Sequence, residues 1–278
     1  MSTQVAAPSA RTSTVPVKEV SFPRVLHGEW VKLWSLRSTY WTVGATLAAM
    51  VLVAVMLAVT LRIDTEASAT GLDGTAAIGL GYTFAQLVVA VLGVLTITGE
   101  YSTGMIRSTL AAVPGRVPAL AAKAVLVAAL GFVLGVAGVT LAYLASYPLL
   151  GSAAADLADP EVRRIFWGTG LYLAAVGLLG LGIGALLRHT AGAVTAVLGV
   201  LLMLSTLWQL FMMASDVFTR TYPYLPSTAG ERIATPQATD VMTDAPQMLA
   251  PWPGFAVFMV YVVITLAASA LLLRRRDA

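Results

Sequence analysis

The chain has 278 residues, of which 58% are hydrophobic and 11% are charged, and its formal net charge is +3. Ordinary soluble domains have about 25% charged residues, so a fold that must cover this much apolar surface in water is excluded. The sequence lacks cysteine, which excludes disulfides and thiolate chemistry. Its apolar residues form long unbroken runs, which favours membrane-spanning helices over a barrel of alternating strands.

The N-terminal part precedes the apolar runs and divides into two segments. Residues 1–21 are polar and rich in Ser, Thr, Ala and Pro, and we predict a disordered cytoplasmic tail. Residues 23–39 have the periodicity of an amphipathic helix, whose apolar face consists of Leu26, Trp30, Leu33 and Trp34. Tryptophans beside basic residues such as Lys32 and Arg37 favour a helix in the membrane interface. The alternative is an amphipathic helix packed on other protein.

Six apolar segments follow, each near the ~20 residues that a helix needs to cross a bilayer. They are residues 41–61, 78–98, 119–147, 165–187, 190–213 and 254–273. We expect the third to be tilted or to extend past the membrane, because it is the longest. Only Arg188 and His189 separate the fourth from the fifth, so one merged or re-entrant hairpin is the main alternative topology. The predicted fold class is therefore an all-α membrane protein with six transmembrane helices.

The basic residues predict the orientation of these helices. With the N-terminus inside, the inner side holds twelve of the seventeen basic residues, and ten of the fourteen acidic residues lie outside. Cytoplasmic loops carry an excess of Lys and Arg. Both termini are therefore predicted to be cytoplasmic, in a multi-pass protein of the cell inner or plasma membrane. The inner basic residues are Arg11, Lys18, Arg24, Lys32, Arg37, Arg107, Arg116, Lys123, Arg188 and Arg274 to Arg276.

The outer segment before the last span, about residues 214–253, contains six of the thirteen prolines. A structureless loop of this length is uncommon, so we predict short helices that rest on or dip into the outer leaflet. The alternative is a solvated hinge loop. Thr228 and Glu231 have the spacing of a capping box, which predicts a short helix near 229–234.

Several chemistries lack their usual residues. Within the predicted spans the charged residue is Lys123, whereas ion-coupled transporters usually need buried ionisable groups. The Gly-Lys dipeptide that ends a P-loop does not occur, so ATP cannot be bound in that way. The zinc motif HExxH and paired carboxylates within the spans are also missing. We therefore expect no catalytic residues, metal, cofactor or nucleic-acid partner for this chain.

Residues 99–124, between the second and third spans, form the most distinctive segment. They read GEYSTGMIRSTLAAVPGRVPALAAKA. Glu100 lies at the end of the second span, and a short helix is predicted from about 101 to 112. Pro114 and Gly115 then stop that helix and turn the chain.

At these residues the sequence resembles the permeases of the type-2 ABC transporter class, the ABC-2 exporters. Those permeases carry a Glu at the end of the second span, a Gly four residues later, a Leu-rich helix, a Pro, a basic residue and a Lys that opens the third span. The matching positions are Glu100, Gly104, Leu110, Pro114, Arg116 and Lys123. Further matches are the N-terminal Glu29, Lys32 and Arg37 and the stretch YLPSTAGERI from Tyr224 to Ile233. The resemblance covers about residues 22–276, with Gly104-Met105 in place of the usual Gly-Thr.

The resemblance implies an ABC-2-type transmembrane domain over residues 22–276. Two copies would form the pathway as a homodimer, and two copies of a separate ABC ATP-binding subunit would hold ATP and Mg. The substrate would be a hydrophobic or amphiphilic drug, lipid or peptide. The segment after the second span would be the coupling helix that enters a cleft of the ATPase, with candidate residues Glu100, Tyr101, Gly104, Arg107 and Arg116.

Two further groups of residues receive a role from the resemblance. The interfacial helix, in contact with membrane lipids, would contribute Trp30, Lys32, Trp34 and Arg37, and the outer gate region would contain Tyr224, Pro226 and Glu231. Three alternatives stay open. Glu100 merely caps the following helix, or the chain is an ion-coupled or uncoupled transporter, or it is a non-transporting scaffold or assembly factor.

Overall fold

The computed structural model describes residues 21–63, 73–112, 117–237 and 246–275. Throughout these ranges the regular secondary structure is helical, and six helices are long and apolar enough to cross a membrane. The prediction of an all-α multi-pass membrane protein is confirmed. The predicted N-terminal tail lies outside the described residues, apart from Ser21.

The helices are named in chain order. They are α1 (Phe22–Ser35), α2 (Arg37–Ile63), α3 (Gly74–Gly79), α4 (Tyr82–Thr103), α5 (Met105–Ala112), α6 (Val117–Leu150), α7 (Pro160–Leu187), α8 (Thr190–Leu198), α9 (Leu204–Met212), α10 (Asp216–Thr221), α11 (Pro226–Glu231) and α12 (Pro251–Arg275). A π-helical segment, Gly199–Met203, joins α8 to α9.

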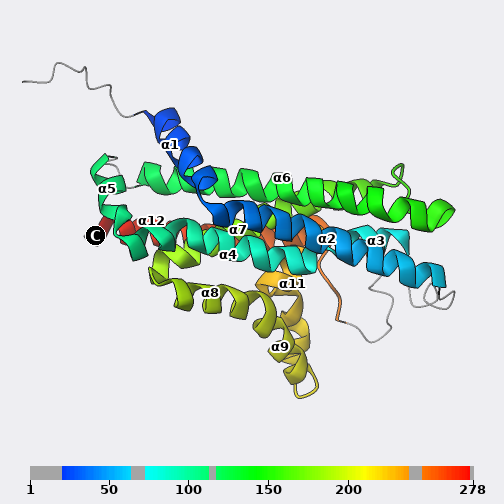
Figure 1. Ribbon diagram of the computed structural model, residues 1–278. Helices are drawn as coiled ribbons and strands as arrows, with labels where there is room; N and C mark the ends of the chain where they lie inside the picture. Colours follow the sequence, from blue (N-terminus) through cyan, green and yellow to red (C-terminus); the bar gives the residue numbers. More distant parts are fainter. Residues whose placement is uncertain (1–20, 64–72, 113–116, 238–245, 276–278) are drawn as a thin grey trace, which may run out of the picture.

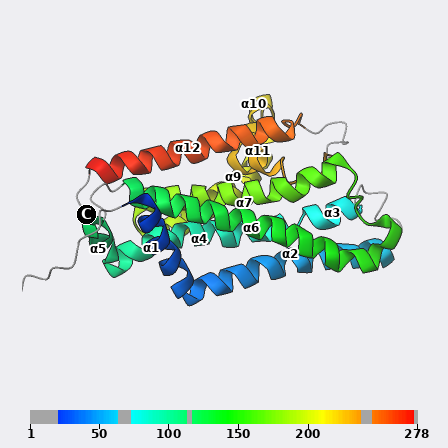
Figure 2. The ribbon, with the colours of Figure 1, turned by 90° about the horizontal axis from the view of Figure 1, so that it is seen from above.

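Helix α7 is the centre of the bundle and packs against α4, α6 and α12, while α2 covers α6 and α4 (Figures 1 and 2). Glycines permit these close approaches. A Cβ on Gly131 would lie 2.8 Å from the carbonyl oxygen of Leu173, and one on Gly135 would lie 2.6 Å from Cα of Gly170. Small residues let helices approach closely in lipid, so the GxxxG spacing of α6 serves the contact between α6 and α7.

The second span is longer than predicted. Helix α4 continues beyond residue 98 through Glu100 to Thr103, and the hydroxyls of Ser102 and Thr103 donate to the carbonyl of Gly99 at 3.0 and 2.8 Å. Gly104 then ends α4 with a φ of 73°, a left-handed conformation that favours glycine. The following helix α5 therefore begins at Met105, not at 101.

The fourth and fifth spans are separate helices, each long and apolar enough to cross a membrane, so they are not merged into one span, and the re-entrant alternative stays open. Arg188 ends α7 with a φ of 55°, and His189 Nδ1 accepts a hydrogen bond from the Gly192 amide at 3.1 Å and caps α8. The span Thr190–Met212 then diverges from the other spans, and 17% of its most apolar stretch is buried in the protein (Figure 1).

Segments predicted to lie on the same side of the membrane are found at the same end of the bundle. Helices α1 and α5 and the end of α12 lie at one end, whereas α3 and the connection between α6 and α7 lie at the other (Figures 1 and 2). This grouping agrees with six membrane crossings. The cytoplasmic placement of the α1 end stays a prediction.

The outer segment contains short helices, as predicted, but α11 begins at Pro226, three residues earlier than expected. The predicted capping box is wrong, because the Thr228 hydroxyl lies 3.2 Å from that of Ser205 and Glu231 accepts from Tyr82. Tertiary packing decides this arrangement. Helix α11 is buried against α12 and α7, so the solvated-hinge alternative is wrong for this helix.

Candidate functional site

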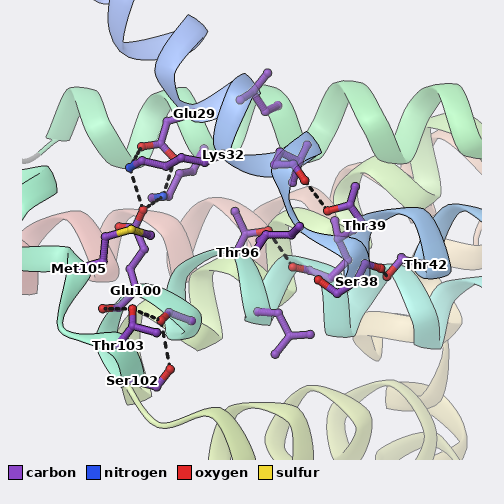
Figure 3. A pocket seen from close by; sticks show the side chains of 17 residues that line it. Glu29, Lys32, Ser38, Thr39, Thr42, Thr96, Glu100, Ser102, Thr103 and Met105 are labelled. Carbon is purple, nitrogen blue, oxygen red and sulfur yellow. Dashed lines mark hydrogen bonds and ion pairs between the residues drawn. The ribbon is translucent and has the colours of Figure 1, made fainter.

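Four charged side chains meet at the end of the bundle that carries α1 and α5. Lys123 Nζ lies 2.5 Å from Glu29 Oε2 and 2.7 Å from Glu100 Oε1. Lys32 Nζ lies 2.8 Å from Glu29 Oε1 and 3.0 Å from Glu100 Oε1. We call Glu29, Lys32, Glu100 and Lys123 the charge cluster. Figure 3 shows Glu29 and Lys32 on α1 facing Glu100 on α4.

The packing of α1 on α6 brings these charges together. Val25, Glu29 and Leu33 form the buried face of α1, and Val25 contacts the small residues Ala119 and Ala122 of α6. Glu29 therefore points at Lys123, the next residue of α6. Lys32 lies one helical turn after Glu29, and residues three apart on a helix are neighbours, so both charges of α1 reach the same point.

The predicted apolar face of α1 is only partly correct. Leu33 is buried, but Trp30 is 47% exposed and its ring lies tilted against that of Trp34, with ring centroids 5.5 Å apart. Arg37 begins α2 and is exposed, outside the charge cluster. The face that packs on α6, with Val25, Glu29 and Leu33, is shifted by one position from the face with Trp30 and Trp34. Glu29 can be buried on this face because it pairs with Lys123. The alternative of a helix packed on other protein is confirmed for the face of α1 against α6, and the placement of Trp30 in the membrane interface stays a prediction.

Charge pairing explains why the cluster is tolerated in an apolar bundle. Glu29, Glu100 and Lys123 are at most 5% exposed, and buried ions are costly unless they are paired. Two acids and two lysines make the cluster neutral. Burial alone would lower the pKa of Lys32, but its hydrogen bonds to Glu29 and Glu100 outweigh this and hold the pKa above its ordinary value.

The charge cluster also holds α5. Lys32 Nζ donates to Thr109 Oγ1 of α5 at 3.1 Å, and Ile106 of α5 is buried in an apolar cluster with Ile97 and Leu120. Glu100 accepts from both lysines through Oε1, so the alternative that Glu100 only caps α5 is wrong. Lys32 is therefore a direct link between α1, α4 and α5.

The other candidate coupling residues take different positions. The guanidinium of Arg188 lies 5.2 Å from the ring centroid of Tyr101 and connects α4 to the turn before α8. Arg107 is exposed on α5. Gly104 provides the left-handed turn between α4 and α5. Arg116, with the stop at Pro114 and Gly115, lies outside the described residues.

The three outer-gate candidates do not form one group. Tyr224 is 51% exposed, Pro226 is buried at the start of α11, and Glu231 points into the bundle. The Tyr82 hydroxyl donates to Glu231 Oε2 at 3.0 Å. The polar residues around this contact were not predicted from the sequence, although Gln86 within an apolar run was a usable signal, because a buried amide needs a partner. That partner is the hydroxyl of Tyr172, 2.6 Å from Gln86 Oε1.

The pKa of Glu231 is strongly changed by its surroundings. Burial raises the pKa of Glu231 to about 7, and the hydrogen bond from Tyr82 and the charge of Arg232 offset only part of this rise. Glu231 therefore changes its charge near neutral pH.

We expect the stability of the protein to fall as the pH rises from about 4.5 to about 7. Over this range the folded state binds more protons than the unfolded state, so each rise in pH favours unfolding. The loss should be about 3 kcal/mol, since the pKa rises from 4.5 to about 7 and each pKa unit corresponds to about 1.4 kcal/mol. Glu231→Gln keeps an acceptor for Tyr82 and should remove this dependence, whereas Asp216→Asn on exposed α10 should retain it. Melting curves in detergent at pH 5 and pH 8 measure the effect, and equal slopes in all three proteins would contradict it.

Two comparisons with known proteins identify no relative of this chain. No family model matches the chain, and a search of the curated proteins finds no match. Among the described residues, no group of three His, Asp or Glu side chains is placed to hold a metal ion. The charge cluster and its contact with α5 are therefore the features of the structure that bear on function.

Proposed function

We propose that this multi-pass membrane protein is the permease subunit of an ATP-driven exporter of the ABC-2 type. Two copies would form the pathway, and two copies of a separate ATP-binding subunit would supply ATP, Mg and hydrolysis. The observation that carries this proposal is the attachment of α5 to the spans through Lys32, which contacts Glu29, Glu100 and Thr109.

A helix that transmits force from a partner needs an accessible outer face and a fixed inner face. Met105 and Arg107 are exposed on α5, whereas Ile106 and Thr109 are buried and are held by the apolar cluster and by Lys32. A displacement of α5 would act on α4 through Gly104 and on α1 through Lys32. It would reach α6 through Lys123, because this lysine shares Glu100 with Lys32.

The exporter would act by movement of these helices. Closure of the ATPase subunits would pull on α5, the spans would rock, and the outer short helices would part. The chain's own residues transmit motion in this scheme and perform no hydrolysis. The proposal places both termini in the cytoplasm and assigns a hydrophobic or amphiphilic substrate, since the bundle is almost free of charge between its ends.

An ion-coupled transporter is the second candidate. It is favoured by the contact between Tyr82 and Glu231, because a carboxyl group with a pKa of about 7 inside a helical bundle suits proton binding. The two candidates differ in their energy source. Export from proteoliposomes driven by ATP supports the first, and export driven by a proton gradient without ATP supports the second.

The partner is tested by purification from the native host in a mild detergent. We expect a P-loop ATPase to copurify with the wild-type chain, and the chain alone to lack ATPase activity. Arg107→Glu on the exposed face of α5 should reduce recovery of the ATPase at least 10-fold, with no effect on melting temperature. The control is Arg163→Glu, which changes another exposed arginine, near the start of α7 at the opposite end. Unchanged recovery with Arg107→Glu would argue against docking through α5.

A further inference from the structure

A cavity of about 230 Å³ lies beside the charge cluster, between α4 and the bend that joins α1 to α2. Leu36 forms this bend in an extended conformation, with φ −87° and ψ 125°, so that α2 turns away from α1 and leaves the space open. We call this space the elbow pocket. A single water needs only about 10–15 Å³, so the elbow pocket is large enough for part of an organic molecule.

The lining of the elbow pocket is amphipathic. All four residues of the charge cluster form its charged end, and both α2 and α4 add hydroxyl groups, from Ser38, Thr39, Thr42, Thr96, Ser102 and Thr103 (Figure 3). Its remaining wall is leucine-rich, and Leu36 and Leu95 are 53% and 38% exposed. These exposed leucines leave the wall open to the outside of the bundle, so the elbow pocket leads from the surface of the bundle to the charge cluster.

The charged end of the elbow pocket contains an acceptor that the protein does not use. Glu100 is 4% exposed, and its Oε1 accepts from both Lys32 and Lys123. Its Oε2 is buried and has no hydrogen-bond donor among the residues that the structure describes. A buried carboxylate oxygen without a donor is costly, so this atom favours a ligand that carries N–H groups.

We propose that the elbow pocket binds an amphiphile whose head group carries a primary ammonium. The ammonium donates to Glu100 Oε2, and the apolar chain lies along the leucine-rich wall toward the membrane. The source is a phospholipid of the phosphatidylethanolamine type or a free long-chain amine.

The charges of the site favour a zwitterionic head group. The charge cluster is neutral, so a bound ammonium alone would add one positive charge next to Lys123. A phosphate in the same ligand restores neutrality, and Lys32 is placed to meet it, because its side chain is 35% exposed while that of Lys123 is 3% exposed. A trimethylammonium group has no N–H, so phosphatidylcholine cannot satisfy Glu100 Oε2. This inference does not depend on export.

The test is lipid binding to the purified full-length protein in detergent, followed by native mass spectrometry and by melting temperature. The probes are dioleoyl phosphatidylethanolamine, dioleoyl phosphatidylcholine and dodecylammonium. We expect the ethanolamine lipid to bind at least 10-fold more tightly than the choline lipid and to raise the melting temperature. Tight binding of dodecylammonium with equal, weak binding of the two lipids would support the site and assign a free amine as its source. Equal binding of both lipids without binding of the amine would overturn the proposal.

Two variants connect this binding to the elbow pocket. Leu95→Trp fills the cavity from α4 and should weaken binding of the preferred probe at least 10-fold. The matched control is Leu141→Trp on α6, where the leucine is 40% exposed compared with 38% for Leu95, and it should bind as the wild type does. Glu100→Gln can present an amide N–H where Oε2 stood, so the preference for an ammonium should disappear. Retention of the full preference in both Leu95→Trp and Glu100→Gln would show that the lipid binds elsewhere.

Discussion

Replacement of Lys123 by methionine is expected to lower the stability of the protein more than any other single change in the charge cluster. Methionine fills a similar volume but leaves Glu29 and Glu100, both at most 5% exposed, with Lys32 as their remaining cation. Removal of one partner from a buried ion pair costs about 3–5 kcal/mol. We therefore expect a drop of roughly 10 °C in melting temperature, at about 2–4 °C per kcal/mol for a chain of this size.

Two further variants separate charge from packing in this prediction. Lys32→Met should cost less, because the Lys32 side chain is 35% exposed while that of Lys123 is 3% exposed. The double variant Lys123→Met/Glu29→Gln restores equal numbers of acids and bases and should recover at least half of the loss. Size-exclusion chromatography after heating measures all three. A double variant less stable than Lys123→Met would show that packing, and not charge balance, sets the stability here.

The fold was predictable to the extent that hydropathy determines it. All six spans are found because ~20 consecutive apolar residues have few other stable environments. Their ends were less accurate, since α4 continues through polar residues to Thr103, and hydropathy does not count these residues as part of a span. Helix α11 was placed three residues late for a related reason. Its start is determined by burial against α12 and α7, which a local capping pattern does not contain.

The charge cluster was predictable in its members but not in its arrangement. Lys32, Glu100 and Lys123 are charges at the edges of apolar segments, and such charges need partners. The sequence does not say that Glu29 and Lys123, 94 residues apart, are those partners, because this depends on which face of α1 packs on α6. The tryptophan pattern did not identify the protein-facing side of α1, because of the four residues in the predicted apolar face Leu33 alone belongs to the buried face. Thr109 could not be identified, because a threonine in a short helix has no distinctive signal.

Glu100→Gln is expected to give a folded, membrane-inserted permease that exports poorly. The glutamine oxygen can still accept a hydrogen bond from Lys123, so the loss of stability should be smaller than for Lys123→Met. The loss of the charge leaves Lys32 and Lys123 to share Glu29, which weakens the link between α4 and the lysine that holds α5. In the proposed exporter, ATP-dependent export should fall at least 10-fold, equivalent to about 1.4 kcal/mol. Transport and substrate-stimulated ATPase activity in proteoliposomes, per inserted permease, measure this effect.

A variant of α5 itself tests whether the charge cluster acts through that helix. Thr109→Val removes the hydroxyl that accepts from Lys32 but keeps the shape of the side chain. If motion of α5 reaches the spans through Lys32, Thr109→Val should reduce export several-fold while the ATPase still copurifies. The matched control is Thr140→Val on α6, whose exposed hydroxyl bonds its own backbone at Val136, and it should export normally. Near-normal export by both Glu100→Gln and Thr109→Val, at normal expression, would show that the charge cluster only stabilises the fold. If Glu100→Gln loses export but Thr109→Val keeps it, motion of α5 would reach the spans through Gly104 and α4. The contact between Lys32 and Thr109 would then not be needed for export.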